Sequence, residues 1–319
     1  MAEPIQAPPA QHAGREDEPV VQMRGVTKRI GKRKLIDNLT LDVPAGEVFG
    51  FLGPNGAGKT TTIRMMVGLM RLSEGEIIIR GQSISTAYEQ AIRHVGAIVE
   101  NPEMYKYLTG YQNLLHFARM IPGISRQRIE EVVELVGLKA RIHDKVKTYS
   151  LGMRQRLGVA QAIMHKPSLL ILDEPTNGLD PAGIRELRDY LRLLARNEGI
   201  TVFVSSHLLS EMELMCDRVA IIQNGRLVDV RPIARGTDAH AAAVTVLLDV
   251  DRADEARQLL AEAGAIIEGG LLRLEADRET VANINARLVG AGFKVYGIRT
   301  QAKSLEDQFL EMTGGERIV

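Results

Sequence analysis

Short apolar runs flanked by glycine alternate with helical patterns from residue 20 to about residue 229. This alternation predicts a mostly parallel sheet covered by helices, which is an α/β architecture. The run 169–172 is apolar at every position, as is typical of a central strand buried on both faces. The strands expected in this region include 48–52, 169–172, 201–205 and 219–223.

The segment from residue 109 to residue 163 has a helical pattern instead. Thr109 and Gln112 are spaced as a capping box, and the apolar residues at 129, 132, 133 and 136 share one helix face. We therefore expect a helical subdomain inserted at about 105–165. A later helix is predicted to begin after Asp180, with Pro181 in its first turn, and to end near Gly199.

A second, smaller domain is predicted after a linker at 231–243, where the composition shifts to Arg, Gly, Asp and Ala. Residues 244–319 have the order β-α-β-β-α-β, the ferredoxin-like arrangement, followed by a last helix that opens at Ser304. Its strands are expected at 244–250, 265–268, 271–275 and 293–298, and its helices at 253–263 and 278–289. The polar, proline-containing residues 1–20 are expected to form a flexible tail, which leaves 21–230 for the first domain.

Composition narrows the classes of protein. A chain of 319 residues with 45% apolar residues is long enough for about two domains, each with a buried core. Forty basic and forty acidic residues give a formal net charge of zero, so no overall field draws the chain to nucleic acid or to an anionic bilayer. Cys216 is the only cysteine, which excludes an internal disulfide and fits a reducing compartment. No apolar run approaches the roughly 18 residues that cross a bilayer.

Residues 53–60, with the sequence Gly-Pro-Asn-Gly-Ala-Gly-Lys-Thr, fit the P-loop pattern between an apolar strand and a helical run at 61–69. The glycines let backbone N–H groups converge on phosphate oxygens at the start of a helix. Lys59 is expected to neutralise the β and γ phosphates, and Thr60 to ligate a Mg²⁺ ion that bridges them. The loop therefore predicts binding of ATP with Mg²⁺, through Gly53, Asn55, Gly56, Gly58, Lys59, Thr60 and Thr61.

Asp173 and Glu174 directly follow the strand 169–172, at the carboxyl edge of the predicted sheet, where ligands bind in this architecture. Because side chains alternate, the two carboxylates point in different directions. Asp173 is predicted to hold the Mg²⁺ shell through water, and Glu174 to polarise the water that attacks the γ phosphate. The alternative is a strand that ends in an acidic turn exposed to solvent.

This set of motifs resembles the nucleotide-binding subunits of ATP-binding cassette (ABC) transporters, and the resemblance covers residues 21–230. It implies a P-loop NTPase fold of the ABC ATPase type, with a mostly parallel sheet and a helical subdomain. Residues 149–156 are similar to the family's signature motif, LSGGQ-RQR, with Ser150 and Gly152 matching it and Tyr149, Leu151 and Met153 departing from it. The resemblance implies that Ser150 and Gly152 grip the γ phosphate of a nucleotide bound by the opposite subunit.

Two more segments resemble the family. Residues 177–180 are similar to its D-loop, which implies that Asp180 lies near the nucleotide. His207 is similar to its switch histidine, which implies a bond to the γ phosphate or to the attacking water, so that Glu174, His207 and Lys59 would form the catalytic group.

Two residues depart from the family pattern. Glu100 stands where the family usually has the glutamine of the Q-loop, as in exporters that confer bacitracin resistance or lantibiotic immunity, and it is expected to contact Mg²⁺ together with Thr60 and Asp173. Ile30 stands where relatives offer an aromatic ring to adenine, so base discrimination is expected to be loose. The basic cluster around it is expected to be a solvated hairpin tip, with contact to phosphates or to a bilayer as the alternative; it comprises Lys28, Arg29, Lys32, Arg33 and Lys34.

The resemblance implies an ATPase that dimerises with ATP, most simply as a homodimer, because the P-loop and the signature motif of one subunit face different nucleotides. We expect the ATP-hydrolysing subunit of an exporter for an antimicrobial peptide, drug or similar compound, bound to a separate transmembrane permease at the cytoplasmic face of the membrane, with no nucleic acid as partner. The alternative is a soluble ABC-type clamp that acts on a ribosome or nucleic acid. For residues 240–319 a ligand sensor and an accessory that stabilises the dimer or contacts the permease both stay open.

Overall fold

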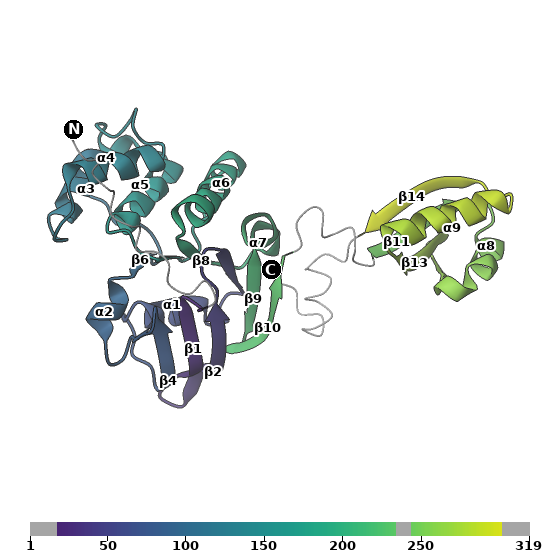
Figure 1. Cartoon of the computed structure of the whole chain (residues 1–319), viewed down its shortest axis with the longest axis horizontal. Helices are drawn as coiled ribbons and strands as arrows, with labels where there is room; N and C mark the ends of the chain where they lie inside the picture. Colours follow the sequence, from purple (N-terminus) through teal and green to yellow (C-terminus); the bar gives the residue numbers. More distant parts are fainter. Residues whose placement is uncertain (1–17, 234–243, 302–319) are drawn as a thin grey trace, which may run out of the picture. The chain divides into compact units, whose positions relative to one another are not determined.

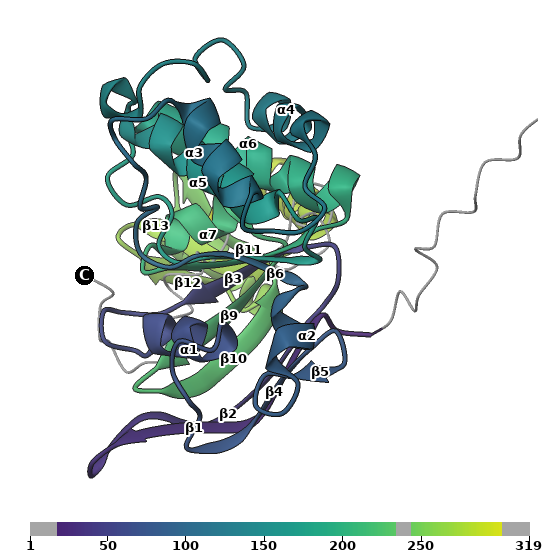
Figure 2. The same ribbon diagram turned by 90° about the vertical axis from the view of Figure 1, so that its left-hand side faces the viewer.

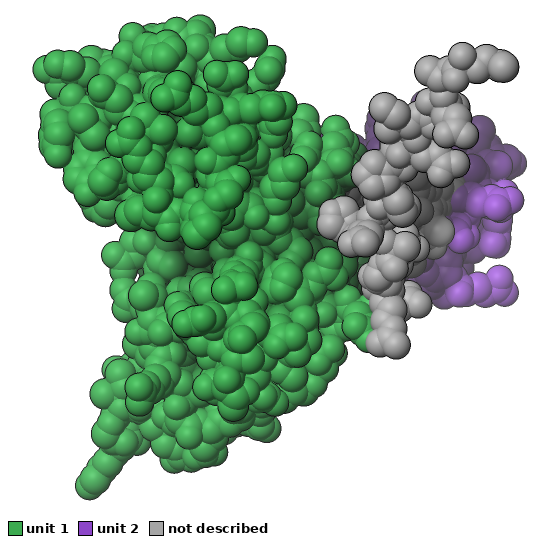
Figure 3. All heavy atoms as spheres, turned by 60° about the vertical axis from the view of Figure 1, so that its left-hand side comes forward, with its two compact units in different colours: residues 1–232, 318 green, residues 233–317, 319 purple. Residues whose placement is uncertain are grey.

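The computed structural model describes residues 18–233 and 244–301. They divide into two compact units, and the division falls between Pro232 and Ile233 (Figure 1 and Figure 3). Each unit has a buried apolar core of its own. Most of the predicted tail and linker, and the helix expected from Ser304, lie outside the described residues.

A six-stranded sheet with the order β10-β9-β3-β8-β7-β6 forms the centre of the first unit. The strands from β9 to β6 pair in parallel, and β10 adds an antiparallel edge. β3 and β7 are buried at every position, and for β7 this confirms the prediction from the uniformly apolar run at 169–172. The sheet comprises β3 (Val48–Leu52), β6 (Val95–Ile98), β7 (Leu169–Leu172), β8 (Thr201–Ser206), β9 (Arg218–Gln223) and β10 (Arg226–Pro232).

A four-stranded antiparallel sheet with the order β2-β1-β4-β5 completes the sheet structure of this unit. Ile36 from this sheet, Phe51 from β3 and Met66 from helix α1 (Lys59–Met66) belong to one buried cluster. The helix that follows the P-loop is therefore fixed by apolar packing against both sheets (Figure 2). The second sheet comprises β1 (Val21–Ile30), β2 (Arg33–Val43), β4 (Glu74–Ile79) and β5 (Gln82–Ser83).

The helical subdomain packs α3, α4 and α5 against one another, grouped away from the antiparallel sheet (Figure 2). The capping box is present: the N–H of Gln112 donates to Thr109 Oγ1 over 3.1 Å, and the N–H of Thr109 donates to Gln112 Oε1 over 2.9 Å. Ile129, Val132 and Val133 are buried on one face of α4, as predicted. The helices are α3 (Gly110–Ala118), α4 (Arg126–Leu135), the 3₁₀ turn η1 (Val146–Thr148) and α5 (Leu151–Ile163).

The remaining helices of the first unit are α1 (Lys59–Met66), α2 (Tyr88–Ile92), α6 (Pro181–Glu198) and α7 (Leu209–Met215). α6 begins after its cap at Asp180 and ends at Gly199, whose φ is 65°, so both predicted ends are confirmed. α1 is shorter than the helical run predicted at 61–69, because Gly68 turns the chain with a φ of 74°. Among the described residues, no helix combines the length and the apolar character that crossing a bilayer requires.

The second unit is a four-stranded antiparallel sheet with the order β12-β13-β11-β14 and two helices, the ferredoxin-like topology. Its core is separate and includes Leu248, Leu272 and Leu288. The helix expected at 253–263 ends earlier, and a 3₁₀ turn follows it. The elements are β11 (Val244–Val250), α8 (Ala253–Leu259), η3 (Ala261–Ala263), β12 (Ile266–Glu268), β13 (Leu271–Ala276), α9 (Arg278–Gly290) and β14 (Val295–Gln301).

Candidate nucleotide-binding site

The P-loop connects the buried strand β3 to helix α1, and two of its glycines have no room for a side chain. A Cβ at Gly53 would lie 2.3 Å from the backbone oxygen of Ile222. Gly58 caps α1 with a φ of 110°, and a Cβ there would lie 2.4 Å from Ile36 Cδ1. Packing from β9 and β2 therefore requires glycine at both positions, and the loop backbone keeps its N–H groups at the helix start.

A pocket of about 570 Å³ opens at this loop. Its cationic groups are Lys59, Arg33 and Lys34, and its one acidic lining residue is Glu174. An excess of positive charge at a helix N-terminus suits a triphosphate. The lining residues are Arg33, Lys34, Leu35, Asn55, Gly56, Gly58, Lys59, Thr60, Thr61, Glu174, Asn177 and Asn224.

The Lys59 side chain is only 6% exposed and is surrounded by oxygen atoms. Its Nζ donates to the Gly53 carbonyl over 2.6 Å and to the Pro54 carbonyl over 3.3 Å. Nζ also lies 3.2 Å from Glu174 Oε1. A buried ammonium is stable only with such partners, and phosphate oxygens are the same kind of acceptor. Lys59 is therefore placed to bind the phosphates of a nucleotide in the pocket.

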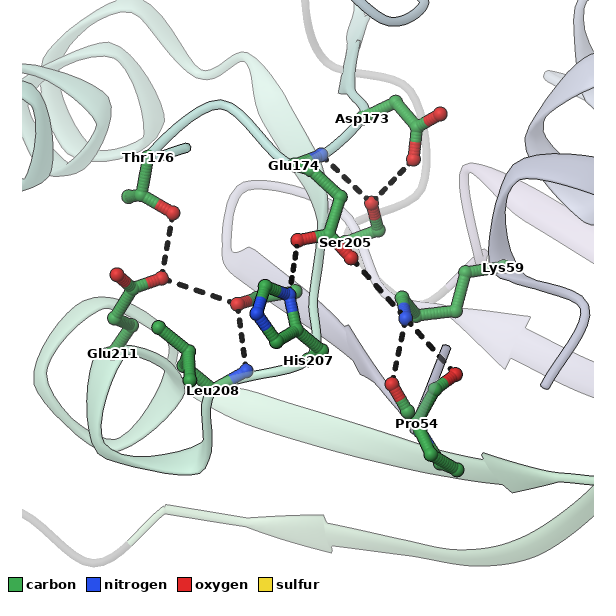
Figure 4. Close-up of polar contacts among 11 residues, drawn as sticks. Pro54, Lys59, Asp173, Glu174, Thr176, Ser205, His207, Leu208 and Glu211 are labelled. Carbon is green, nitrogen blue, oxygen red and sulfur yellow. Dashed lines mark hydrogen bonds and ion pairs between the residues drawn. The ribbon is translucent and has the colours of Figure 1, made fainter. Parts of the chain in front are cut away.

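Glu174 bonds two of the predicted catalytic groups at once (Figure 4). Its Oε2 lies 2.7 Å from His207 Nδ1, and its Oε1 is the atom that faces Lys59. The backbone of Glu174 has a φ of 48°, a left-handed conformation that a side chain rarely adopts. In this conformation the Glu174 carboxylate, just after β7, contacts His207, which follows β8.

Asp173 is 3% exposed, and its Oδ1 accepts a hydrogen bond of 2.7 Å from Ser205 Oγ. Ser205 Oγ also accepts the backbone N–H of Glu174 over 2.9 Å, so one hydroxyl on β8 fixes both acidic residues. In the described part of the chain, Asp173 Oδ2 has no hydrogen-bond partner. A carboxylate oxygen left available in this way, with the Thr60 hydroxyl in the pocket lining, is the hard oxygen donor set that Mg²⁺ prefers.

The signature and D-loop residues lie outside the pocket lining. Ser150 caps α5, and its Oγ accepts the N–H of Met153 over 3.2 Å. Asp180 caps α6 in the same way, since its Oδ1 accepts the N–H of Gly183 over 3.0 Å. A Cβ on Gly152 would lie 3.7 Å from Leu179, so the start of α5 packs beside the D-loop. These three residues form a second group, which one chain does not bring to its own P-loop pocket.

The two departures from the family pattern also lie outside the pocket lining. Glu100 has a φ of 66° and forms an ion pair with Arg64 at the surface. Contact of Glu100 with Mg²⁺ stays a prediction. The Ile30 side chain is 57% exposed at the tip of the β1–β2 hairpin, and the neighbouring wall of the pocket consists of Arg33, Lys34 and Leu35.

Sequence reasoning missed several functional neighbours. Arg33 and Lys34 were expected at a solvated hairpin tip, but both line the pocket; their position in a basic cluster was the signal for contact with phosphates. The Lys34 and Arg226 side chains donate to Asp37 and lower the pKa of its carboxyl. Ser205, Thr176 and Glu211 belong to no motif, and their role comes from contacts between β8, α7 and the segment after β7.

Comparison with known proteins agrees with this geometry. Residues 36–177 match the family described as ABC transporter. The chain is 55% identical over 296 residues to an uncharacterized ABC transporter ATP-binding protein, YhcH, of Bacillus subtilis (strain 168), which covers 92% of this chain and 96% of that protein. It is also 38% identical over 311 residues to the bacitracin transport ATP-binding protein BcrA of Bacillus licheniformis. That match covers 94% of this chain and 99% of BcrA.

A solved structure, described as an ATP binding subunit of an ABC transporter, superposes with a TM-score of 0.59 at 25% identity and covers 85% of this chain and 99% of that one. The two relatives compared by sequence match nearly the whole chain. The P-loop and Glu174 line one pocket, and Glu174 contacts both Lys59 and His207. The chain belongs to the ATP-binding, ATP-hydrolysing subunits of ABC transporters.

Proposed function

We propose that this chain powers an exporter for an antimicrobial peptide, drug or similar compound, at the cytoplasmic face of the membrane and together with a separate transmembrane permease. The support is the function of two relatives, namely the bacitracin transport protein and a linearmycin resistance ATP-binding protein of Bacillus subtilis (strain 168) that is 31% identical over 307 residues. The alternative was a soluble ABC-type clamp that acts on a ribosome or nucleic acid. The chain belongs to the transporter family, and no observation among the described residues supports that alternative.

The observation that carries the catalytic part is the chain of contacts from Lys59 through Glu174 to His207. When a triphosphate enters the pocket, its oxygens compete with Glu174 for the Lys59 ammonium. Glu174 is then left with His207 as its partner and is placed to accept a proton from the attacking water. The P-loop N–H groups and Lys59 hold the phosphates during this step.

Mg²⁺ fits the donors present, with the Thr60 hydroxyl and the Asp173 carboxylate as its binding residues and Glu100 as a predicted further contact. When bound, the ion would neutralise the negative charge that develops on the phosphates, while Thr60 and Asp173 would hold it. The Ser205 hydroxyl holds Asp173 in one orientation, so that the carboxylate does not need to reorganise.

A second copy of this chain is proposed to complete the site. Ser150, Gly152 and Asp180 lie at two helix starts outside the chain's own pocket, and the exposed Ser150 hydroxyl retains a proton that it can donate. Two chains related by a two-fold axis place each signature helix against the other chain's P-loop. Binding of ATP then closes the dimer and hydrolysis opens it, which is the motion that a permease would use.

The test is transport in cells. The chain is expressed together with a candidate transmembrane permease, and growth inhibition by bacitracin and by a lantibiotic is compared with that of cells carrying Glu174→Gln. The proposal predicts resistance that depends on Glu174 and is unaffected by Glu186→Gln, a matched change on the exposed face of α6. Active ATPase with equal sensitivity in all strains would contradict export of this class of compound.

A further inference from the structure

Glu211 lies on the first turn of α7, and its carboxylate is buried, with 9% of the residue exposed. A buried carboxylate normally pairs with a cation. In the described residues no Lys, Arg or His forms an ion pair with Glu211. Two hydroxyl groups bond it instead: Thr176 Oγ1 donates to Oε2 over 2.6 Å, and Ser206 Oγ donates to the same oxygen over 3.1 Å (Figure 4).

The two hydroxyls belong to the two segments that carry the catalytic pair. Thr176 stands two residues after Glu174, in the turn beyond β7. Ser206 directly precedes His207 at the end of β8, and its Oγ also accepts the N–H of Leu208 over 3.0 Å. The carboxylate of Glu211 therefore joins the turn of Glu174 to the residues on both sides of His207.

The backbone of Glu174 needs such support. Its φ of 48° is sparsely populated by residues with a side chain, and a conformation of this kind persists only where neighbouring contacts hold it. Three contacts bear on it: Ser205 Oγ accepts the N–H of Glu174, the Glu174 carbonyl accepts the N–H of Asn177 over 3.2 Å, and the bond from Thr176 to Glu211 ties the turn that follows to α7. Of these contacts, only the bond from Thr176 to Glu211 leads through a side chain to Ser206, the residue before His207, whose Nδ1 lies 2.7 Å from Glu174 Oε2.

We propose that Glu211 is a positioning residue for ATP hydrolysis: it does not line the pocket, and it acts by holding Glu174 and His207 together. The inference rests on the proposed function of that pair. The P-loop and Lys59 hold the phosphates independently of Glu211. Loss of the Glu211 carboxylate therefore lowers kcat and leaves the affinity for ATP unchanged.

The experiment measures the steady-state ATPase of the purified full-length chain with Mg²⁺, and the binding of ATP by equilibrium titration. Glu211→Leu is expected to lower kcat by about 10- to 100-fold, as a misplaced catalytic group does, with the Kd for ATP within about twofold of the parent. Thr176→Val, a smaller change that removes one hydroxyl, is expected to lower kcat less. Because both variants cut the same bond, the double variant is expected to be no worse than Glu211→Leu.

The conservative variant Glu211→Gln distinguishes a positioning role of Glu211 from a role in folding stability alone. The amide oxygen of Glu211→Gln can accept both hydroxyls, so its kcat is expected to stay within about threefold of the parent. The matched control is Glu198→Leu, which makes the same chemical change at the exposed end of α6. Its kcat and its Kd for ATP are expected to equal those of the parent. Thermal unfolding identifies any variant that does not fold. If Glu211→Leu does not fold, the kcat values of Thr176→Val and Glu211→Gln test the positioning role instead.

The outcomes are distinct. If the parent chain does not hydrolyse ATP with Mg²⁺, the proposed function fails. If the parent is active and folded Glu211→Leu and Thr176→Val keep the parental kcat, or lose affinity for ATP in proportion to kcat, the positioning role of Glu211 is overturned alone. An inactive but folded Glu211→Gln would also overturn it.

Discussion

The nucleotide machinery of this chain has two groups of residues that are built in different ways. Lys59, Glu174 and His207 contact one another over 3.2 Å and 2.7 Å, and all three are largely buried. Ser150 and Asp180 bond only the backbone of their own helices and lie exposed. The contacts of the first group are complete within one chain, whereas the second group lies outside that chain's own pocket, and the proposed dimer would bring it to the nucleotide of the other chain. Under the proposed function, we therefore expect the P-loop group to carry out hydrolysis and the signature group to make hydrolysis depend on the dimer.

The largest effect is expected from the first group. Lys59→Ala removes the ammonium that faces the phosphates and also leaves Glu174 without its cation. We expect hydrolysis to fall by at least about 100-fold and the affinity for ATP to fall with it. Phosphate release and ATP titration measure the two effects, with Lys139→Ala, an exposed lysine on the helical subdomain, as the control. If Lys59→Ala hydrolysed ATP at the parental rate, Lys59 would have no role in hydrolysis.

Glu174→Gln is expected to separate chemistry from binding. The amide keeps the size of the side chain but does not accept a proton from water, so kcat should fall by about 100- to 10,000-fold with ATP still bound. His207→Ala should slow hydrolysis more than it weakens binding, because the imidazole contacts Glu174 and lies outside the lining of the pocket. Rapid-quench measurement of a single turnover checks both. A His207 variant that binds ATP poorly and hydrolyses what it binds at the parental rate would contradict this division.

Mixing two inactive chains tests the comparison directly. Lys59→Ala disables a P-loop, and Ser150→Arg disables a signature helix. In an equal mixture half of the dimers contain one of each chain, and each such dimer has one intact site, so about a quarter of the parental sites should recover. If both groups served the same chain's nucleotide, the mixture would be as inactive as its components.

The smallest effect is expected at the surface. Glu100→Gln breaks an exposed ion pair with Arg64, and pairs of this kind contribute about 0–1 kcal/mol to folding. The free energy of unfolding, measured with urea, should therefore change by less than about 1 kcal/mol. A change in the Mg²⁺ concentration at half-maximal ATPase would support contact of Glu100 with the ion, and an unchanged value would leave Glu100 as a surface residue paired with Arg64.

The sequence predicts best where local pattern decides the structure. The bounds of β3 and β7, the capping box at Thr109 and both ends of α6 follow from apolar runs, caps and glycine, and the structure confirms them. The P-loop is predictable for the same reason, since one contiguous segment holds the chemistry. The order of the motifs along the chain, from the P-loop to the switch histidine, also indicates the ABC transporter family from sequence alone.

Prediction from sequence stops where contacts join distant segments. Nothing near Glu211 marks its carboxylate as buried, because its partners lie 35 and five residues away in the chain. The φ of 48° at Glu174 and the hydroxyl of Ser205 between the two acidic residues are likewise products of tertiary packing. Arg33 and Lys34 line the pocket because the β1–β2 hairpin ends there, which charge pattern alone left open.

The most direct test of the central claim, that two copies of the chain enclose each nucleotide, is the molar mass of Glu174→Gln in solution. With Mg²⁺ and ATP, light scattering should give twice the 35.1 kDa of one chain, and the added change Ser150→Arg should restore the mass of the monomer. A Glu174→Gln chain that binds ATP and stays at 35.1 kDa at every protein concentration would contradict the account.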